Sequence, residues 1–124
     1  MQLYKSIILV DDDPINNLIN KRLITKLSIS EKVEEFLEAE KALQKLKTMD
    51  PGETTLILLD INMPVMNGWD FLNVYLKEFP DRNDRIFVLS SSIDLQDRQK
   101  AMQYKVVKGF VEKPLTPEKM KNLV

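Results

Sequence analysis

The chain of 124 residues contains neither cysteine nor histidine. Without cysteine it can form no disulfide, no thiolate metal site and no cysteine nucleophile. Without histidine it lacks a Ser-His or Cys-His dyad, a zinc-histidine site and any phosphohistidine chemistry of its own. These two absences exclude several classes of hydrolase and zinc enzyme.

An excess of positive charge and a long hydrophobic run are missing as well. Lys and Arg number 18 and Asp and Glu number 19, a net charge of -1, whereas a nucleic-acid-binding domain is usually strongly basic. No segment approaches the roughly 18 apolar residues that a membrane span needs. The first residues, MQLYKSIILVDDD, do not resemble a signal peptide. We therefore expect a cytoplasmic protein that binds neither nucleic acid nor a membrane.

The composition suits one globular domain over residues 1–124. Apolar residues make up 44% and charged residues 30% of the chain, and this length can bury a core without disulfides or metals. Short apolar runs predict strands at residues 6–10, 32–36, 55–59, 85–89 and 109–112. The first, third and fourth runs are almost wholly apolar, which is typical of strands covered on both faces. The second alternates more and is predicted at an edge of the sheet.

Segments long enough for helices separate these runs. Pro14 suits the first position of a helix over residues 14–27, whose apolar residues fall on one helical face. Further helices are expected within residues 39–49, 68–79, 92–105 and 115–124. Ser92 or Asp94 would cap the fourth helix and Thr116 the fifth. The alternation of strands and helices predicts an α/β fold, in which helices cover both faces of a parallel sheet.

Polar residues follow the predicted strands at the edge where ligands bind to open parallel sheets. They are Asp11, Asp12 and Asp13 after the first strand, Asp60 after the third, Ser90, Ser91 and Ser92 after the fourth, and Lys113 after the fifth. Carboxylates about 4 Å apart repel by roughly 4 kcal/mol per pair at an effective dielectric near 20, and a bound Mg²⁺ relieves this repulsion. A lysine and a hydroxyl can hold phosphoryl oxygens, so these residues suit phosphoryl transfer to Asp60 as the nucleophile.

At these residues the chain resembles the receiver domain of two-component response regulators. The motifs that carry the resemblance are ILVDDDP, LLDINMPVMNG, VLSSS and GFVEKPLT, in the order and at the approximate spacing of the family. Together they are highly specific, and they span nearly the whole chain. The resemblance implies a flavodoxin-like (βα)5 fold, a doubly wound five-stranded parallel sheet of order 2-1-3-4-5.

The resemblance also assigns roles to individual residues. Asp60 is implied as the phosphoacceptor and as an Mg²⁺ ligand. Asp12 would bind the ion directly, Asp11 partly through water, and Asn62 through its backbone carbonyl. Lys113 stands at the lysine of the family, and the peptide bond between Lys113 and Pro114 is implied to be cis.

Four further assignments concern the response to phosphorylation. Ser90 stands where the family has a Thr or Ser that follows the phosphoryl group. Phe110 stands where many members have the aromatic switch residue Tyr, so a ring is kept but its hydroxyl is lost. Asn62 and Ser92 occupy positions that tune the lifetime of the phosphoaspartate.

The expected function is a phosphorylation switch that assists its own phosphorylation and dephosphorylation but is not a turnover enzyme. A sensor histidine kinase or a histidine phosphotransfer protein would supply the phosphoryl group. The surface of the fourth helix, fifth strand and fifth helix would then bind a downstream protein. The chain itself is expected to be a monomer or a phosphorylation-dependent dimer. The alternatives are a receiver-like interaction module that is never phosphorylated and an aspartyl-phosphate phosphatase. The phosphatase is disfavoured because its general acid is usually an Asp two positions after the nucleophile, where this chain has Asn62.

Overall fold

Five parallel strands form one sheet in the computed structural model, which describes residues 3–91 and 94–123. The strand order is β2-β1-β3-β4-β5, and each neighbouring pair is parallel. The strands are β1 Tyr4–Val10, β2 Ser30–Phe36, β3 Thr55–Leu59, β4 Arg85–Ser90 and β5 Val107–Glu112. The predicted flavodoxin-like fold is confirmed, including the position of the second strand at an edge.

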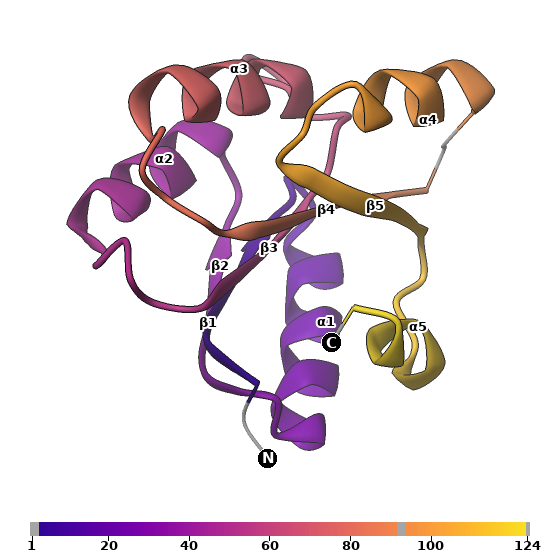
Figure 1. Ribbon diagram of the computed structural model, residues 1–124. Helices are drawn as coiled ribbons and strands as arrows, with labels where there is room; N and C mark the ends of the chain where they lie inside the picture. Colours follow the sequence, from indigo (N-terminus) through magenta and orange to yellow (C-terminus); the bar gives the residue numbers. More distant parts are fainter. Residues whose placement is uncertain (1–2, 92–93, 124) are drawn as a thin grey trace.

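Five helices cover the two faces of this sheet (Figure 1). They are α1 Pro14–Leu27, α2 Ala39–Thr48, α3 Gly68–Glu78, α4 Leu95–Met102 and α5 Pro117–Lys121. Buried hydrophobic residues of α2, α3 and α4 belong to one hydrophobic cluster, and those of α1 and α5 belong to another. Within the described residues, no helix is both long and apolar enough to cross a membrane.

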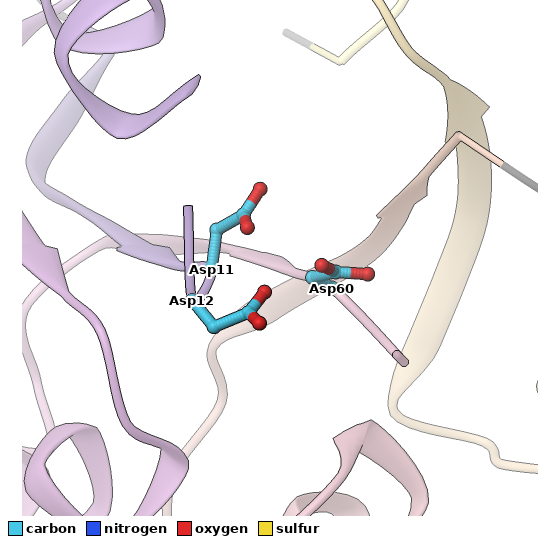
Figure 2. Close-up of side chains that lie close together, drawn as sticks. All are labelled: Asp11, Asp12 and Asp60. Atoms are coloured by element: carbon cyan, nitrogen blue, oxygen red, sulfur yellow. The ribbon is translucent and has the colours of Figure 1, made fainter. Parts of the chain in front are cut away.

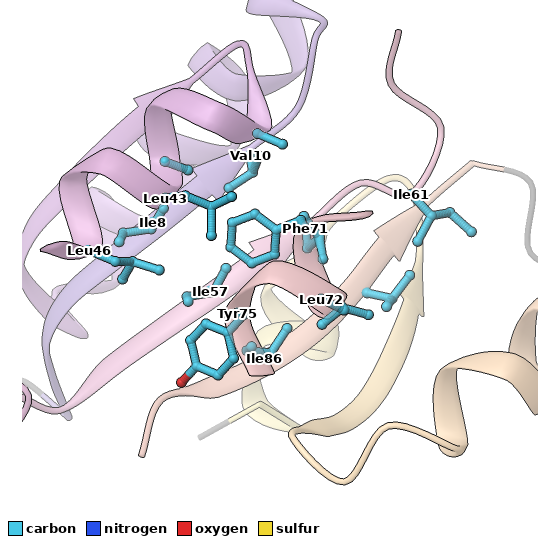
Figure 3. Packing of buried hydrophobic residues seen from close by; sticks show 14 of the residues in the cluster. Ile8, Val10, Leu43, Leu46, Ile57, Ile61, Phe71, Leu72, Tyr75 and Ile86 are labelled. Atoms are coloured by element: carbon cyan, nitrogen blue, oxygen red, sulfur yellow. The ribbon is translucent and has the colours of Figure 1, made fainter. Parts of the chain in front are cut away.

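Alternate residues of each central strand supply the two clusters. In β1, Ile8 and Val10 pack in the cluster under α2, α3 and α4, whereas Ile7 and Leu9 pack in the cluster under α1 and α5. Figure 3 shows the first cluster, in which Phe71 of α3 lies among residues of the sheet and α2. Since side chains alternate between the faces of a strand, the continuous apolar runs of the sequence follow from burial on both faces.

Three helices begin where the sequence predicts: α1 at Pro14, α4 after Asp94 and α5 after Thr116. Pro14 is the first residue of α1, after Asp13, whose Oδ1 accepts from the backbone N–H of Ile15 at 2.9 Å. Asp94 caps α4 and Thr116 caps α5 through their side chains. The alternative cap of the fourth helix, Ser92, lies outside the described residues. Each cap satisfies an N–H group that the helix itself leaves unpaired.

The buried face of α1 differs from the apolar face seen in the sequence. The buried residues of α1 are Asn17, Asn20 and Ile24, whereas Ile15 and Ile19 are 66% and 55% exposed. The prediction of one apolar helical face is therefore wrong for the first half of this helix. Asn17 takes the inner position because its amide Nδ2 donates to the backbone carbonyl of Asp11 at 2.9 Å.

Candidate functional site

Three carboxylates from two strands lie together at the carboxyl edge of the sheet (Figure 2). Asp11 and Asp12 follow β1, Asp60 follows β3, and one oxygen from each lies within 4.8 Å of the others. Asp11 and Asp60 are buried, whereas Asp12 is exposed. The structure thus brings together three of the four acids that the sequence predicts at this edge, whereas Asp13 caps α1.

Backbone hydrogen bonds fix the two buried acids beyond the ends of their strands. The N–H of Asp11 donates to the carbonyl of Phe36 at 3.0 Å, and the N–H of Asp60 donates to that of Val10 at 2.9 Å. Both bonds join neighbouring strands across the sheet. The positions of these carboxylates therefore depend on the strand register rather than on a free loop.

Lys113 brings a positive charge to the two buried acids. Its Nζ donates to Oδ2 of Asp11 at 2.6 Å and lies 3.5 Å from Oδ2 of Asp60. The backbone N–H of Lys113 donates to the carbonyl of Ser90 at 3.0 Å. The peptide bond between Lys113 and Pro114 is cis, the isomer that the resemblance implies. The lysine after β5 therefore reaches across β4 to acids that follow β1 and β3.

Burial raises the pKa of Asp60 to about 6, although the N–H of Asn62 and the charge of Lys113 oppose the rise. The negative charge of Asp11 adds to it. Burial by itself would lower the pKa of Lys113, but the hydrogen bond from Lys113 to Asp11 and the charges of Asp60 and Asp11 raise it. Near neutral pH the site therefore holds an ionised Asp60 beside a protonated lysine.

Two other predicted residues, Asn62 and Ser90, lie beside Asp60. The N–H of Asn62 donates to Oδ1 of Asp60 at 3.1 Å, and its amide Nδ2 donates to Oγ of Ser90 at 3.4 Å. Ser90 is fully buried at the end of β4. Ser92, the second residue predicted to tune the lifetime, lies outside the described residues. Asn62 therefore links Asp60 to Ser90, the first through its backbone N–H and the second through its side-chain amide.

Phe110, the switch candidate, is half-buried on β5. The guanidinium of Arg98, from α4, lies 4.7 Å from the centre of the Phe110 ring. This distance is within the range of a cation–π interaction. The ring of Phe110 thus joins β5 to α4. This contact needs only the aromatic ring and not the hydroxyl that a tyrosine would carry.

Gly68 has a positioning role that the sequence interpretation missed. It is the first residue of α3, at the start of the helix that the sequence predicts within residues 68–79. A Cβ at this position would lie 2.7 Å from Cα of Ile61 and 2.8 Å from the carbonyl oxygen of Asp60. Only glycine therefore lets α3 begin directly against the backbone of the phosphoacceptor candidate. The position of Gly68 at the start of a helical pattern, after a good cap in Asn67, was the available signal.

Asn17 is a second residue that the sequence interpretation missed. Its side chain is fully buried, and its Nδ2 donates to the carbonyls of Asp11 and Phe36 at 2.9 and 3.4 Å. It thereby holds the loop between β1 and α1, on which the acid pair lies. The available signal was its helical spacing from Ile24, which places both on one side of α1.

The donor set fits Mg²⁺. Carboxylate oxygens are the ligands that this ion prefers, and it usually keeps several waters when only a few carboxylates bind it. Asp11, Asp12 and Asp60 supply three such groups, against one lysine in contact with them. Among the described residues Asp12 forms no ion pair, so the cluster retains negative charge for a cation to balance.

Fold and site together define a receiver, and the chain belongs to the family of response regulator receiver domains, whose model matches residues 7–124. Chemotaxis protein CheY of Thermotoga maritima is 30% identical over 120 residues, which cover 94% of this chain and 91% of that protein. A two-component response regulator from Cytophaga hutchinsonii has a solved structure with a TM-score of 0.90 at 31% identity, covering 98% of this chain and 95% of that one.

Other relatives are longer than this chain. The probable C4-dicarboxylate response regulator DctR of Halalkalibacterium halodurans is 28% identical over 115 residues, which cover 93% of this chain but 47% of that protein. The shared part is the receiver domain of two-component signalling. Receiver domains are signalling phosphoacceptors that use Mg²⁺ and work with histidine kinases or phosphotransfer proteins and with downstream targets.

Proposed function

We propose that Asp60 accepts a phosphoryl group from a phosphohistidine of a sensor kinase or phosphotransfer protein. The observation that carries this proposal is the contact of Lys113 with both buried acids, 2.6 Å to Asp11 and 3.5 Å to Asp60, beside a cluster that fits Mg²⁺. In the transfer, a carboxylate oxygen of Asp60 forms a bond to phosphorus while the bond from phosphorus to the histidine nitrogen breaks. The electron pair of the broken bond stays on the imidazole, which takes up a proton.

The residues around Asp60 would have two roles, binding of Mg²⁺ and binding of the phosphoryl oxygens. Asp11, Asp12, Asp60 and the carbonyl of Asn62 would hold Mg²⁺, which when bound supplies positive charge against the phosphoryl oxygens. Lys113 would hold one phosphoryl oxygen, since it is protonated and already beside Asp60.

After transfer, the hydroxyl of Ser90 would bond the phosphoryl group and give up the hydrogen bond that it accepts from the side-chain amide of Asn62. The movement would repack Phe110 and change the surface formed by α4, β5 and α5, which a downstream protein would bind. Asn62 and Ser92 would set the lifetime of the phosphoaspartate. The chain would act as one receiver unit over residues 1–124, as a switch without substrate turnover, in the cytoplasm where histidine kinases use ATP. It would act as a monomer or as a phosphorylation-dependent dimer.

The exposed apolar residues of α1 support a protein as the phosphoryl donor. Ile15, Leu18 and Ile19 are 66%, 44% and 55% exposed, on the helix that begins directly after the acid cluster. Their spacing of three and four residues places them on one side of the helix. A donor that presents its phosphohistidine to Asp60 could bury this side of α1.

Intact mass spectrometry tests the proposal. The protein is incubated with acetyl phosphate and Mg²⁺, and the same reaction is run with a chelator, with Asp60→Asn, and with Asp81→Asn as an exposed control. We expect a gain of one phosphoryl group in the wild type and in Asp81→Asn, and none with the chelator or with Asp60→Asn. A gain that persists in Asp60→Asn would reject Asp60 as the acceptor. No gain under any condition would favour the interaction module.

A further inference from the structure

A groove of about 450 Å³ opens at the surface between α3 and the end of α4. It is lined by Leu76 of α3, by Lys100 of α4, and by Gln103, Tyr104 and Lys105, which follow α4. Both helices cover the same face of the sheet (Figure 1). The volume lies within the range of about 300–1,000 Å³ that is usual for ligand pockets.

The apolar part of the groove is already ordered. The ring of Tyr104 stacks on that of Trp69, with 6.0 Å between ring centres, and its hydroxyl donates to Oδ1 of Asn73 at 3.1 Å. Leu76 is 44% exposed beside it. A ligand that covers Leu76 and Tyr104 would bury apolar surface without first having to order the tyrosine side chain.

The polar part of the groove is positively charged. Lys100 and Lys105 line it, no acidic residue lines it among the described residues, and neither lysine forms an ion pair within the part of the chain that the structure describes. Nζ of Lys100 lies 4.7 Å from the centre of the Trp69 ring. Residues 98–108 contain four basic residues and no acidic one, although the whole chain has a net charge of -1.

We propose that this groove binds an acidic amphipathic helix of a partner protein. An apolar side chain of the helix would cover Leu76 and Tyr104, and its carboxylates would meet Lys100 and Lys105. Amphipathic helices bind to apolar grooves in this way in other complexes, and complementary charge selects the partner. The groove includes Lys100 of α4 but no residue of β5 or α5, and its occupation does not require phosphorylation of Asp60.

A nucleic acid would match the two lysines but would leave the apolar part of the groove unused. Binding of nucleic acid also depends mainly on several contacts to phosphates, usually from a strongly basic surface. Two lysines beside an exposed leucine and a tyrosine fit a ligand that is acidic on one side and apolar on the other. The observations therefore favour the helix.

Isothermal titration calorimetry with two matched peptides tests the proposal on the unphosphorylated protein without Mg²⁺. Each peptide has about 18 residues, enough to form a helix, with Leu and Phe along one face. One peptide carries Glu at its polar positions and the other carries Lys. We expect saturable binding of the acidic peptide, weakened by added salt, and no binding of the basic peptide. Trp69, the only tryptophan, lies against Tyr104 and should change its fluorescence as the groove fills.

Variants locate the site. The double substitution Lys100→Glu with Lys105→Glu should lower the affinity for the acidic peptide by about tenfold or more and should create binding of the basic peptide. Leu76→Gln should lower the affinity for the acidic peptide, whereas the dependence of that affinity on salt should not change. Lys41→Glu, at an exposed position on α2, should bind like the wild type. Circular dichroism and thermal unfolding of each variant check that it is folded.

Three results would overturn the proposal. They are the absence of saturable binding of the acidic peptide, equal binding of both peptides by the wild type, and undiminished binding by the folded double variant. Since every titration uses unphosphorylated protein, failure here leaves the role of Asp60 intact, and failure of the phosphorylation assay leaves the groove intact.

Discussion

At the scale of single residues, Asp60 reduces the stability of the fold that holds it. The side chain is buried, and this burial raises its pKa from 3.8 to about 6. A carboxyl whose folded pKa is raised binds its proton more tightly in the folded than in the unfolded state. The stabilisation that comes from this tighter proton binding is therefore complete below about pH 3.8, and it is lost as the pH rises through about 6 and Asp60 ionises.

Asp60→Asn should accordingly stabilise the protein at pH 7 and not at pH 3.5. A shift of one pKa unit corresponds to about 1.4 kcal/mol, so the gain at pH 7 should be about 1–3 kcal/mol. Urea unfolding of both proteins with a chelator, at the two pH values, measures it. The exposed control Asp81→Asn should show no such dependence on pH. Equal stabilities of wild type and Asp60→Asn at pH 7 would contradict the cost assigned to burial.

Lys113 contacts both buried acids, so its removal should separate phosphorylation from response. We expect Lys113→Ala to accept a phosphoryl group at Asp60, because the Mg²⁺ ligands remain. The rearrangement of α4 and β5 should fail, because no cation then joins the phosphoryl group to β5. Intact mass reports phosphorylation, and amide hydrogen exchange in α4 and β5 reports the response. Lys108→Ala, at an exposed position on β5, serves as the control, and a normal response in Lys113→Ala would count against this role.

At the scale of elements, the start of α3 is set by one close approach. Gly68→Ala would place Cβ 2.7 Å from Cα of Ile61, so the helix or the strand end must move. We expect a loss of about 1–3 kcal/mol in the free energy of unfolding and slower phosphorylation of Asp60. Gly52→Ala is the matched control, since its Cβ would come no closer than 3.4 Å to Asp50. Unchanged stability and rate in Gly68→Ala would show that the contact is easily relaxed.

The pairing of α4 with β5 through Arg98 and Phe110 can be measured as a coupling energy. A double-mutant cycle of Arg98→Gln and Phe110→Leu, followed by urea unfolding, should give about 0.5–1 kcal/mol for this cation–π pair, whose guanidinium is exposed and whose ring is half-buried. Arg98→Lys should retain part of it. Strictly additive effects of the two substitutions would mean that the ring and the guanidinium do not stabilise each other.

The elements themselves were largely predictable, and the exceptions have a common cause. The strands were predictable because burial on both faces leaves a continuous apolar run, as at residues 55–59. The inner face of α1 was not, because Asn17 is buried through hydrogen bonds to the carbonyls of Asp11, in the preceding loop, and of Phe36, at the end of β2. A pattern of hydrophobic residues carries no information on such bonds, nor on the space that Gly68 leaves for the backbone of Asp60.

At the scale of the whole molecule, the site links ion binding to folding. A ligand that binds only the folded state stabilises it by RT ln(1 + [L]/Kd), about 2.7 kcal/mol when the free ligand is at 100 times Kd. Mg²⁺ should therefore raise the unfolding temperature of the wild type by several degrees. The effect should be smaller in Asp12→Asn, whose exposed carboxylate is removed without a change in the core. Scanning calorimetry with and without the ion measures both. An equal rise in the two proteins would place the ion elsewhere.

That the site residues lie at one edge of the sheet was predictable from the sequence, but the individual contacts between their side chains were not. The topology brings the ends of β1, β3, β4 and β5 to one edge, so the meeting of Asp11, Asp60 and Lys113 follows from strand order. The hydrogen bond of Lys113 to Asp11 depends on side-chain conformation and strand register. The aromatic stack of Trp69 on Tyr104 joins α3 to the segment after α4, and no local pattern in the sequence predicts it.

The sheet divides the interior into two separately packed halves, one under α2, α3 and α4 and the other under α1 and α5. Substitutions far apart and without shared partners usually have additive effects on stability. Changes to the exposed side of α1 and changes to the groove between α3 and α4 should therefore have additive effects on stability. A lineage of such proteins could change the protein that donates the phosphoryl group without altering the groove between α3 and α4, or the reverse.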